Sequence, residues 1–300
     1  MPELPEVETI RRQLVPLVEG RRCVEAASHW SEKFLPAREV TGARFLELKR
    51  KGKYLICGLD SEGIGSEREL IIHLGMTGSL LVVEGADGDD CSSEKNSSRT
   101  GTRKAPLAPT RIYEPPLEAE HIRARWWLDN GSQLIFNDIR RFGRLRIVPT
   151  GHYETAPTLA AQGPDALSSD FTPEVLHARL RKSTRTLKTQ LLSQRPVAGL
   201  GNIYADEALW ESSIHPARRN LSFARCETLH QAIIEVLQRA LKFGGTTLRD
   251  YRTPDASTGN FQKKLKCYGR AGYPCPRCNT TLRKQVIDAR TTTWCPHCQR

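Results

Sequence analysis

Arg125-Trp126-Trp127-Leu128 and Gln133-Leu134-Ile135-Phe136 are two short runs of mainly aromatic and aliphatic residues, and Asp129-Asn130-Gly131 stands between them. Asn-Gly is a strong signal for a β-hairpin, because both residues tolerate the positive φ angles that a tight turn between twisted strands requires. The stretch therefore predicts two antiparallel strands joined by a short turn.

Similar apolar runs recur on the N-terminal side of this hairpin, at residues 54–57, 70–74 and 80–83. Several short strands at this spacing favour a β-sandwich or barrel over residues 44–149. Residues 4–18 instead predict a helix, because Pro5 suits a first turn and Val7, Ile10 and Leu14 recur at helical spacing. Residues 85–111, rich in Gly, Asp, Ser and Lys, are interpreted as a flexible surface insertion.

After about residue 150 the pattern becomes helical. Thr172-Pro173 predicts a capped helix start, and Ser222 predicts another whose apolar residues recur every fourth position until Gly244-Gly245. Gly199-Leu200-Gly201 precedes a further helical segment, and such a turn exposes backbone N–H groups to an anion. On its own this glycine motif is weak.

Four of the nine cysteines follow a Cys-x2-Cys pattern twice, at Cys275, Cys278, Cys295 and Cys298. This spacing is typical of a zinc ribbon, in which two hairpins supply tetrahedral thiolate ligands. One Zn²⁺ held in this way is structural, because four protein ligands leave no open position for a substrate. Disulfides are the alternative, and they are disfavoured because nothing indicates an oxidising compartment.

The chain of 300 residues carries a formal charge of +11, and the cations concentrate near the C-terminus. Residues 260–300 hold nine Lys or Arg against one acid, Asp288. A basic segment of this kind points to phosphate, and nucleic acid is favoured over a membrane surface because the segment has no amphipathic apolar face and no lipidation signal. A merely basic surface is the alternative. Without an apolar signal segment, the protein is predicted to be intracellular.

The sequence begins Met1-Pro2-Glu3. Removal of Met1 would free the Pro2 nitrogen as an α-amine, which titrates near ~7.7–8.0 and is far more often neutral at pH 7 than a lysine. Amine nucleophiles form Schiff bases with carbonyl-type carbons, and a neighbouring acid can move the protons. These residues alone fit an ordinary terminus better.

Motifs spread along the whole chain nevertheless resemble those of the bacterial formamidopyrimidine-DNA glycosylases (Fpg or MutM). The resemblance excludes only 85–111, and it is carried by these stretches: Met1-Pro2-Glu3-Leu4-Pro5-Glu6-Val7-Glu8-Thr9, Lys53-Tyr54-Leu55, His73-Leu74-Gly75-Met76-Thr77-Gly78-Ser79-Leu80, Arg140-Arg141-Phe142-Gly143, Gly201-Asn202-Ile203-Tyr204-Ala205-Asp206-Glu207, Gly244-Gly245-Thr246-Thr247 and Tyr268-Gly269-Arg270 before the cysteines. Ile139 and Cys267 depart from the family pattern without removing a reactive group.

The resemblance implies an α+β multidomain fold. We expect an N-terminal β-sandwich with an N-terminal helix over 2–150, a helix–two-turns–helix domain over 151–255 and a four-cysteine zinc finger over 256–300. DNA would lie in the cleft between the halves. The implied activity is that of a bifunctional DNA glycosylase and abasic-site lyase of base excision repair, which acts on double-stranded DNA containing oxidised purines such as 8-oxoguanine and formamidopyrimidines. A cytoplasmic, nucleoid-associated bacterial monomer is expected.

The resemblance also assigns catalytic roles. Pro2 would attack the sugar C1′ and form an imine, so that β- and then δ-elimination break the backbone. Glu3 would move protons, Lys53 would act as general acid or base, and Arg290 would donate a proton in δ-elimination. Without the family, Lys53 is better interpreted as a solvated or phosphate-contacting charge. For Arg290, simple phosphate contact is an equal alternative.

Contacts to DNA follow by the same resemblance. Phe142 would wedge the base stack, Met76 would fill the emptied space and Arg140 would bind the orphaned cytosine, although Met76 could instead lie in the core. Phosphate contacts are expected from four further residues: His121, Arg185, Lys188 and Asn202. The loop that reads the lesion is expected within 246–262. Two alternatives stay open, an endonuclease VIII-like enzyme for oxidised pyrimidines and a catalytically inactive zinc-ribbon DNA-binding protein.

Overall fold

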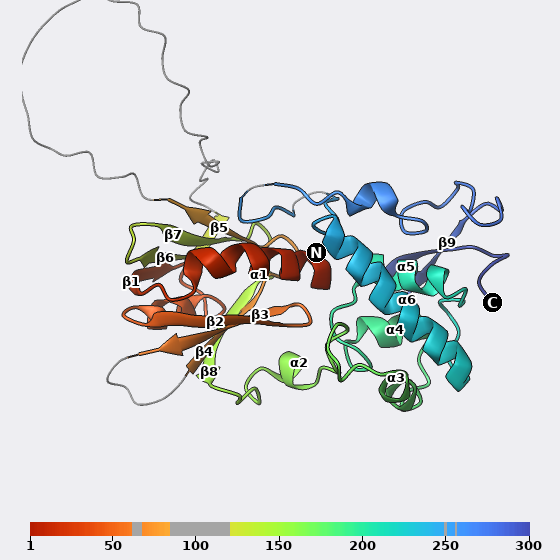
Figure 1. Cartoon of the computed structure of the whole chain (residues 1–300), viewed down its shortest axis with the longest axis horizontal. Helices are drawn as coiled ribbons and strands as arrows, with labels where there is room; N and C mark the ends of the chain where they lie inside the picture. The colour runs from red at the N-terminus through yellow and green to blue at the C-terminus, as the bar shows by residue number, and fades with distance from the viewer. Residues whose placement is uncertain (62–67, 85–120, 249–250, 256) are drawn as a thin grey trace, which may run out of the picture.

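The predicted hairpin forms as strands β6 (Ile122–Leu128) and β7 (Gln133–Asn137), in which Trp126 lies opposite Leu134. Gly131 in the turn has φ of +81°, which explains the glycine. The computed structural model describes residues 1–61, 68–84, 121–248, 251–255 and 257–300. Figure 1 shows the strands β1 to β8 with helix α1 in one half of the molecule, and helices α3 to α6 with β9 in the other.

Two four-stranded antiparallel sheets form the β half, in the orders β1-β6-β7-β5 and β2-β3-β4-β8. The other six strands are β1 (Cys23–Ser28), β2 (Arg44–Lys51), β3 (Tyr54–Asp60), β4 (Arg68–His73), β5 (Ser79–Val83) and β8 (Arg144–Pro149). Their inner side chains, among them Phe45, Leu55, Leu70, Trp126 and Phe136, share one buried core. The predicted β-sandwich is confirmed.

Helix α1 (Leu4–Val18) has the predicted bounds and packs Val7, Ile10 and Leu14 into that same core. Its N-terminus carries a capping box, in which the Glu3 backbone N–H donates to the Glu6 carboxylate. The N-terminal segment is therefore fixed to the sandwich by a packed helix. The short 3-10 helix η1 (Leu35–Val40) lies between β1 and β2 in the chain.

The helical half has its own core. Thr172 caps α3 as predicted, since its hydroxyl accepts from the Val175 N–H at 3.3 Å, whereas the Ser222 side chain makes no such bond although it precedes α6. The elements are α2 (Pro157–Ala160), α3 (Pro173–Leu180), α4 (Leu187–Leu192), α5 (Asn202–Glu211), α6 (Phe223–Lys242), the 3-10 helix η3 (Phe261–Lys264), β9 (Arg283–Ile287) and β10 (Arg290–Trp294). Leu229, Ile233 and Leu237 are buried core residues.

The predicted insertion at 85–111 lies outside the described residues. The domain boundaries near 150 and 255 stay predictions. Among the described residues, no helix combines the length and the apolar character needed to cross a membrane.

Candidate active site

The glycine turn before α5 binds an anion supplied by the chain itself. The carboxylate of Glu3, only 2% exposed, accepts from the backbone N–H groups of Gly201 at 2.6 Å and Ile203 at 2.9 Å. A Cβ on Gly201 would lie 2.3 Å from the Glu3 carboxyl carbon, so glycine is required for this approach. The positive end of α5 also favours a carboxylate here. The predicted anion site at this turn therefore holds Glu3, and it ties the N-terminal segment to the helical half.

Glu6 forms a second buried carboxylate beside the first. Its Oε2 accepts from the Glu3 N–H at 2.8 Å, and its Oε1 accepts from the Thr246 N–H at 2.7 Å and from the Tyr204 hydroxyl. Burial, with the nearby Glu3 charge, raises the pKa of Glu6 to about 7, against the lowering effect of these hydrogen bonds. Sequence analysis assigned Glu6 no role, although its position three residues after the cap Glu3 signalled the capping box.

The raised pKa of Glu6 predicts a pH-dependent stability. The folded protein holds the proton more tightly than the unfolded chain, so this contribution is present below pH 4.5 and is lost as the pH rises through about 7. Its size is on the order of 3 kcal/mol. We expect Glu6→Gln to flatten the fall in unfolding free energy between pH 5 and 8, measured by urea denaturation. If the unfolding free energy of Glu6→Gln fell with pH as steeply as that of the parent, this expectation would be contradicted. Glu235→Gln, at an exposed position, serves as the control.

Pro2 lines a cavity of about 330 Å³ together with the expected DNA-contacting residues Met76 and Arg140. Thr246 and Leu248, from the segment expected to read the lesion, line the same cavity. Residues that lie far apart in the sequence thus meet around Pro2. This convergence is what a site for an extruded nucleotide requires.

Lys53 lies in an adjacent cavity of about 500 Å³, which Met1 also lines. The tight turn before Lys53 is held by Asp165, which accepts from the Gly52 N–H at 2.7 Å. Lys53 is 6% exposed, and this burial lowers its pKa against the opposing effect of Glu3, while the Arg290 charge lowers it further. A larger fraction of Lys53 is therefore neutral than for a lysine in water, as a general base requires.

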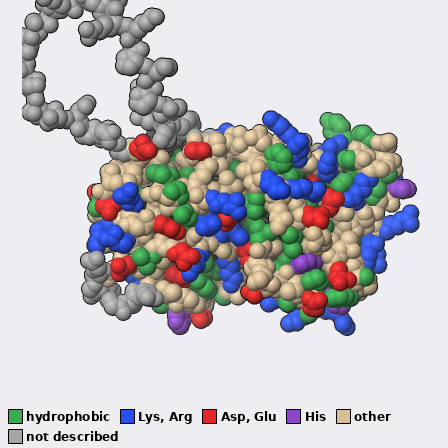
Figure 2. Space-filling model, in the orientation of Figure 1, with side chains coloured by type: hydrophobic (Ala, Val, Ile, Leu, Met, Phe, Trp, Pro, Cys, Tyr) green, Lys and Arg blue, Asp and Glu red, His purple; other side chains and the backbone are tan. Residues whose placement is uncertain are grey.

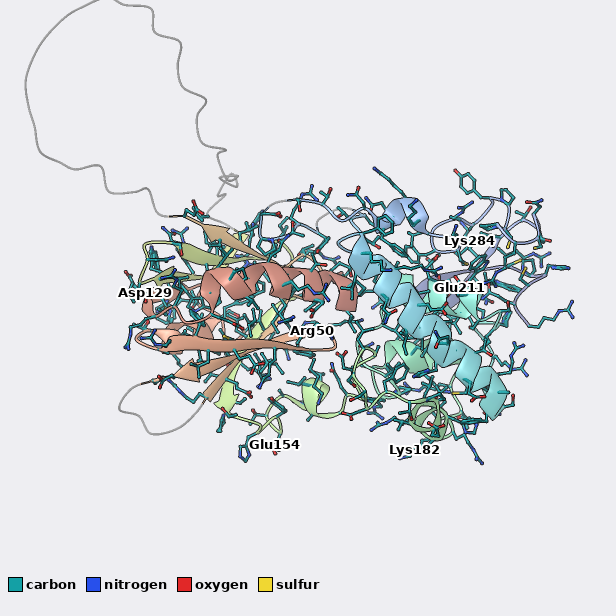
Figure 3. The ribbon with its side chains drawn as sticks, in the orientation of Figure 1. Arg50, Asp129, Glu154, Lys182, Glu211 and Lys284 are labelled. Atoms are coloured by element: carbon teal, nitrogen blue, oxygen red, sulfur yellow. The ribbon has the colours of Figure 1, made fainter. Side chains whose placement is uncertain are left out.

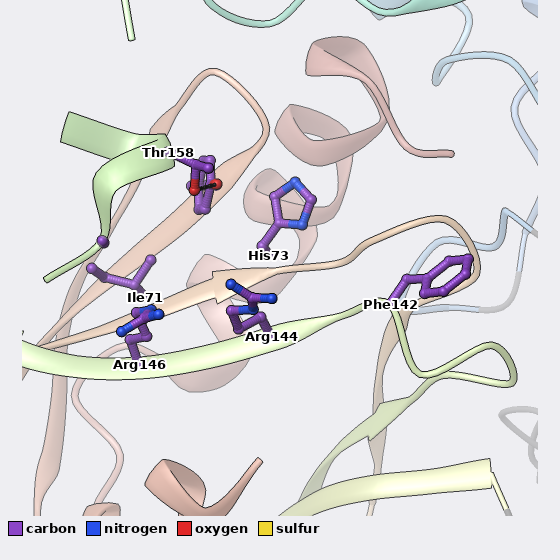
Figure 4. Close-up of a pocket in the computed structure, with 8 residues that line it drawn as sticks. Ile71, His73, Phe142, Arg144, Arg146 and Thr158 are labelled. Carbon is purple, nitrogen blue, oxygen red and sulfur yellow. Dashed lines mark hydrogen bonds between the residues drawn. The ribbon is translucent and has the colours of Figure 1, made fainter. Parts of the chain in front are cut away.

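A third cavity, of about 230 Å³ (Figure 4), shares Tyr54, His73 and Thr158 with the Lys53 cavity. The cavity is lined by His73 of β4 and by Arg144 and Arg146 of β8. Phe142, from the loop before β8, also lines it. Burial, with the charges of Lys53 and Arg144, lowers the pKa of His73 to about 4, so this ring is neutral at pH 7. The Phe142 ring is half exposed and lies under the Arg140 guanidinium, 4.7 Å from it, rather than in the core.

Arg290 begins β10, directly after a two-residue turn. Asp288 and Ala289 both have positive φ angles, as a tight hairpin turn requires, and the Arg290 side chain is exposed. The next residue, Thr291, uses its carbonyl to accept from the Asn202 side chain at 3.1 Å and from the Lys188 ammonium at 3.2 Å. The hairpin that carries Arg290 is therefore fixed to α4 and α5.

The expected phosphate contact from Lys188 is contradicted by its burial. Its ammonium is 0% exposed and pairs with Asp206 at 2.6 Å. It also donates to the Thr291 carbonyl and to the Thr292 hydroxyl at 2.8 Å, so its three donors are all used within the protein. Lys188 therefore supports the Arg290 hairpin from inside the protein.

The other expected phosphate contacts are at least partly exposed as residues, although Asn202 Oδ1 and His121 Nδ1 are buried atoms. Arg185 is exposed before α4, and Asn202 is half-buried in the first turn of α5. His121 is half-buried just before β6, and its carbonyl accepts from the Asp138 N–H at 2.9 Å. Their contacts with DNA stay predictions.

The four zinc-ribbon cysteines come together as predicted, with all four sulfur atoms within 4.8 Å of one another. Pairs such as Cys275–Cys298 at 4.0 Å and Cys278–Cys295 at 3.6 Å are too far apart for disulfides, whose S–S bond is about 2.05 Å. Tetrahedral ligation with Zn–S bonds of about 2.3 Å gives sulfur separations of roughly 3.8 Å, so the thiolates fit one structural Zn²⁺. Trp210 of α5 packs against the cluster.

Comparison with known proteins supports this architecture. Three family models match: the formamidopyrimidine-DNA glycosylase N-terminal domain over residues 1–145, the formamidopyrimidine-DNA glycosylase H2TH domain over 162–252, and the zinc finger found in FPG and IleRS over 272–300. The formamidopyrimidine-DNA glycosylases of Deinococcus radiodurans and Rhodopseudomonas palustris (strain TIE-1) are 39% and 37% identical, over 100% of this chain and 97% and 100% of theirs.

Solved structures agree. The MutM (Fpg) protein of Thermus thermophilus has a TM-score of 0.81 at 38% identity, covering 99% of this chain and 98% of that one. The Lactococcus lactis Fpg in complex with DNA containing an abasic site has a TM-score of 0.79 at 31% identity, covering 99% of each chain. The chain therefore belongs to the formamidopyrimidine-DNA glycosylases, a family of DNA glycosylases of base excision repair.

Proposed function

We propose that this protein is a bifunctional glycosylase and abasic-site lyase that removes oxidised purines from double-stranded DNA through a Schiff base on Pro2. The observation that supports this most is the shared cavity of Pro2, Met76 and Arg140, with Glu3 buried beside it. The similar L. lactis Fpg structures contain DNA with an abasic site or a Fapy-dG. DNA with a Fapy-dG fits the proposed base removal, and DNA with an abasic site fits the proposed lyase reaction.

The first step uses the amine of Pro2 once Met1 has been removed. Its lone pair attacks the sugar C1′, the C1′–base bond breaks, and the departing base takes up a proton. The Pro2 nitrogen then gives up its own proton. Protonation of O4′ as the C1′–O4′ bond breaks opens the sugar ring, which leaves an iminium in which the Pro2 nitrogen is doubly bonded to C1′. Because Pro2 is a secondary amine, this iminium carries a positive charge without needing a proton, which makes it a durable electron sink.

Glu3 and Lys53 are the groups that we assign to proton transfer. Glu3 is fixed at the N-terminus of α5 by backbone N–H donors and follows Pro2 directly in the chain. Lys53 is kept more often neutral by burial and lies in the cavity next to that of Pro2. A fixed carboxylate and a partly neutral lysine can accept and return the protons that base loss and ring opening move.

Strand cleavage then follows from the iminium. Loss of a proton from C2′ expels the 3′ phosphate, and a second elimination expels the 5′ phosphate. We assign Arg290 to the second step, as proton donor or as a phosphate contact that stabilises the leaving group. Its charge lies close enough to Lys53 to lower that pKa, and α5 and Lys188 hold its hairpin in place.

Extrusion of the nucleotide needs side chains that replace it in the duplex. Met76 is half-buried at the Pro2 cavity and has a flexible side chain that can fill irregular space. Phe142 offers an exposed ring for stacking, and Arg140 is exposed above it. We assign Phe142 to wedge into the base stack and Met76 to fill the space that the extruded nucleotide leaves. Arg140 is assigned to bind the cytosine that has lost its partner.

The substrate assignment has a direct test. We expect single-turnover excision from an 8-oxoguanine:C duplex to be at least about tenfold faster than from a thymine glycol:A duplex, because a pocket distinguishes bases through differential transition-state contacts. Gel analysis of both duplexes at saturating protein measures this. Faster release of the pyrimidine would instead favour the endonuclease VIII-like alternative.

A further inference from the structure

Two separate loops carry the side chains that we assign to replace the extruded nucleotide. Met76 lies between β4 and β5, whereas Arg140 and Phe142 lie between β7 and β8. Met76 and Arg140 line the Pro2 cavity, but Phe142 lines the cavity of His73. If the three side chains are to enter a duplex together, a connection between the two loops is therefore needed.

A buried carboxylate makes this connection. Asp138 follows β7, is 0% exposed, and accepts from the Thr77 hydroxyl at 2.5 Å through Oδ1. Its Oδ2 accepts from the Gly143 N–H at 2.7 Å, which closes the loop that carries Phe142. Because the Thr77 proton is directed to the carboxylate, the Thr77 oxygen can accept, and it does so from the Arg140 N–H at 3.1 Å. We refer to these three hydrogen bonds as the Thr77–Asp138 link.

Each of the three assigned side chains lies beside a bond of the Thr77–Asp138 link. Met76 directly precedes Thr77, and the Arg140 N–H is itself a donor in the link. Phe142 directly precedes the residue whose N–H closes its loop. Since neighbouring residues share a planar peptide group, the link determines where all three backbones lie.

The link is anchored in the sandwich. Arg123 of β6, 1% exposed, donates through Nε to the Asp138 carbonyl at 2.7 Å, and the Asp138 N–H donates to the His121 carbonyl at 2.9 Å. Arg141 has φ of +57°, which a residue with a Cβ rarely adopts without support from its surroundings. The exposed loop therefore has its conformation fixed from its buried side.

We propose that Asp138 and Thr77 are positioning residues that couple void filling by Met76 to insertion of Phe142. This inference rests on the proposed function, since it takes the roles of Met76 and Phe142 in extrusion from it. Two side chains fixed in one arrangement enter the duplex without a separate ordering cost for each. Sequence analysis gave neither Asp138 nor Thr77 a role.

The test is a double-mutant cycle of Met76→Ala and Phe142→Ala, made in the parent and in Thr77→Val. Stopped-flow fluorescence of 2-aminopurine placed next to 8-oxoguanine follows extrusion without requiring base removal. In the parent, we expect the double variant to extrude the nucleotide about tenfold faster than the product of the two single effects gives, because each side chain acts fully only when the other enters. Thr77→Val deprives the Asp138 carboxylate and the Arg140 N–H of a partner, so there the two effects should multiply to within about twofold.

The conservative variant Thr77→Ser keeps the hydroxyl and should keep the tenfold coupling. Thr228→Val is the matched control, because it removes an exposed hydroxyl that donates to the Ala224 carbonyl at 3.0 Å within α6. Its coupling should equal that of the parent. The proposal would be overturned if Thr77→Val kept the parental coupling, or if Thr77→Ser lost it as completely as Thr77→Val.

Asp138→Asn tests the carboxylate itself. An amide offers one acceptor oxygen where the carboxylate offers two, so the donors from Thr77 and Gly143 cannot both be satisfied as before, and extrusion should slow by about tenfold. The control is Asp129→Asn, the same change in the turn between β6 and β7. Figure 3 shows Asp129 at the end of the sandwich away from the helical half, and this variant should extrude at the parental rate.

Extrusion by Asp138→Asn at the parental rate would refute the assignment. Failure of the proposed function looks different, because the parent itself would then give neither the 2-aminopurine signal nor excision of 8-oxoguanine.

Discussion

Pro2→Gly is expected to slow single-turnover excision of 8-oxoguanine by about 100-fold or more. The variant has a primary amine, whose imine can lose its proton and its charge, and it lacks the ring that fixes the nitrogen in the cavity. Borohydride reduction should trap a covalent protein–DNA adduct with the parent protein and much less with the variant. The excision of 8-oxoguanine and the formation of the adduct are both measured on denaturing gels.

The control is Pro16→Ala, which changes an exposed proline within α1 and should leave trapping unchanged. Intact-mass measurement must show that Met1 is absent, since a retained Met1 blocks the amine. An adduct formed by Pro2→Gly at the parental rate would point to another nucleophile such as Lys53. No adduct from a correctly processed parent would favour the inactive DNA-binding alternative.

Loss of zinc is the second large effect. We expect Cys295→Ala to weaken DNA binding by roughly 100-fold or more, because the hairpin bearing Arg290 depends on the metal for its fold and several phosphate contacts go with it. Zinc content, anisotropy and thermal unfolding measure the outcome. The β-sandwich has a separate core and should keep its own cooperative transition.

The finger is less independent than its sequence indicates. Arg277 donates to the Trp210 carbonyl at 2.7 Å, and Glu207 accepts from the Cys267 N–H at 2.8 Å. Zinc loss should therefore also loosen α5. Cys226→Ala, a buried thiol outside the cluster, is the control and should keep both zinc and DNA affinity. Unfolding of the sandwich together with the finger would contradict the prediction.

The distribution of charge fits a DNA-binding face assembled from both halves. Figure 2 shows Lys and Arg side chains over the helical half and at its junction with the sandwich. Sequence counting placed the basic excess at the C-terminus, yet Arg179, Lys182, Arg185 and Arg195 also gather around one cavity in the helical half. These cations also lie within one short stretch of sequence, but only the structure shows that they line one cavity while Lys188, in the same stretch, is buried.

Local signals explain which features the sequence could predict. The turn at Asn130-Gly131, the first-turn Pro5, the cap at Thr172 and the spacing of the cysteines act over a few residues, so each predicts an element where the structure has one. Family motifs then added Pro2 and its expected partners, which no local pattern supplies.

What the chain alone settled was therefore several of the elements, the four cysteine ligands and the family motifs, because short-range backbone and side-chain chemistry specifies them. Only the tertiary structure decided that Glu3 occupies the anion site before α5, that Glu6 is buried with a raised pKa, and that Lys188 is turned inward against Asp206. Burial and electrostatics depend on segments far apart in the chain, and a charged residue looks the same in sequence whether it meets solvent or a buried partner.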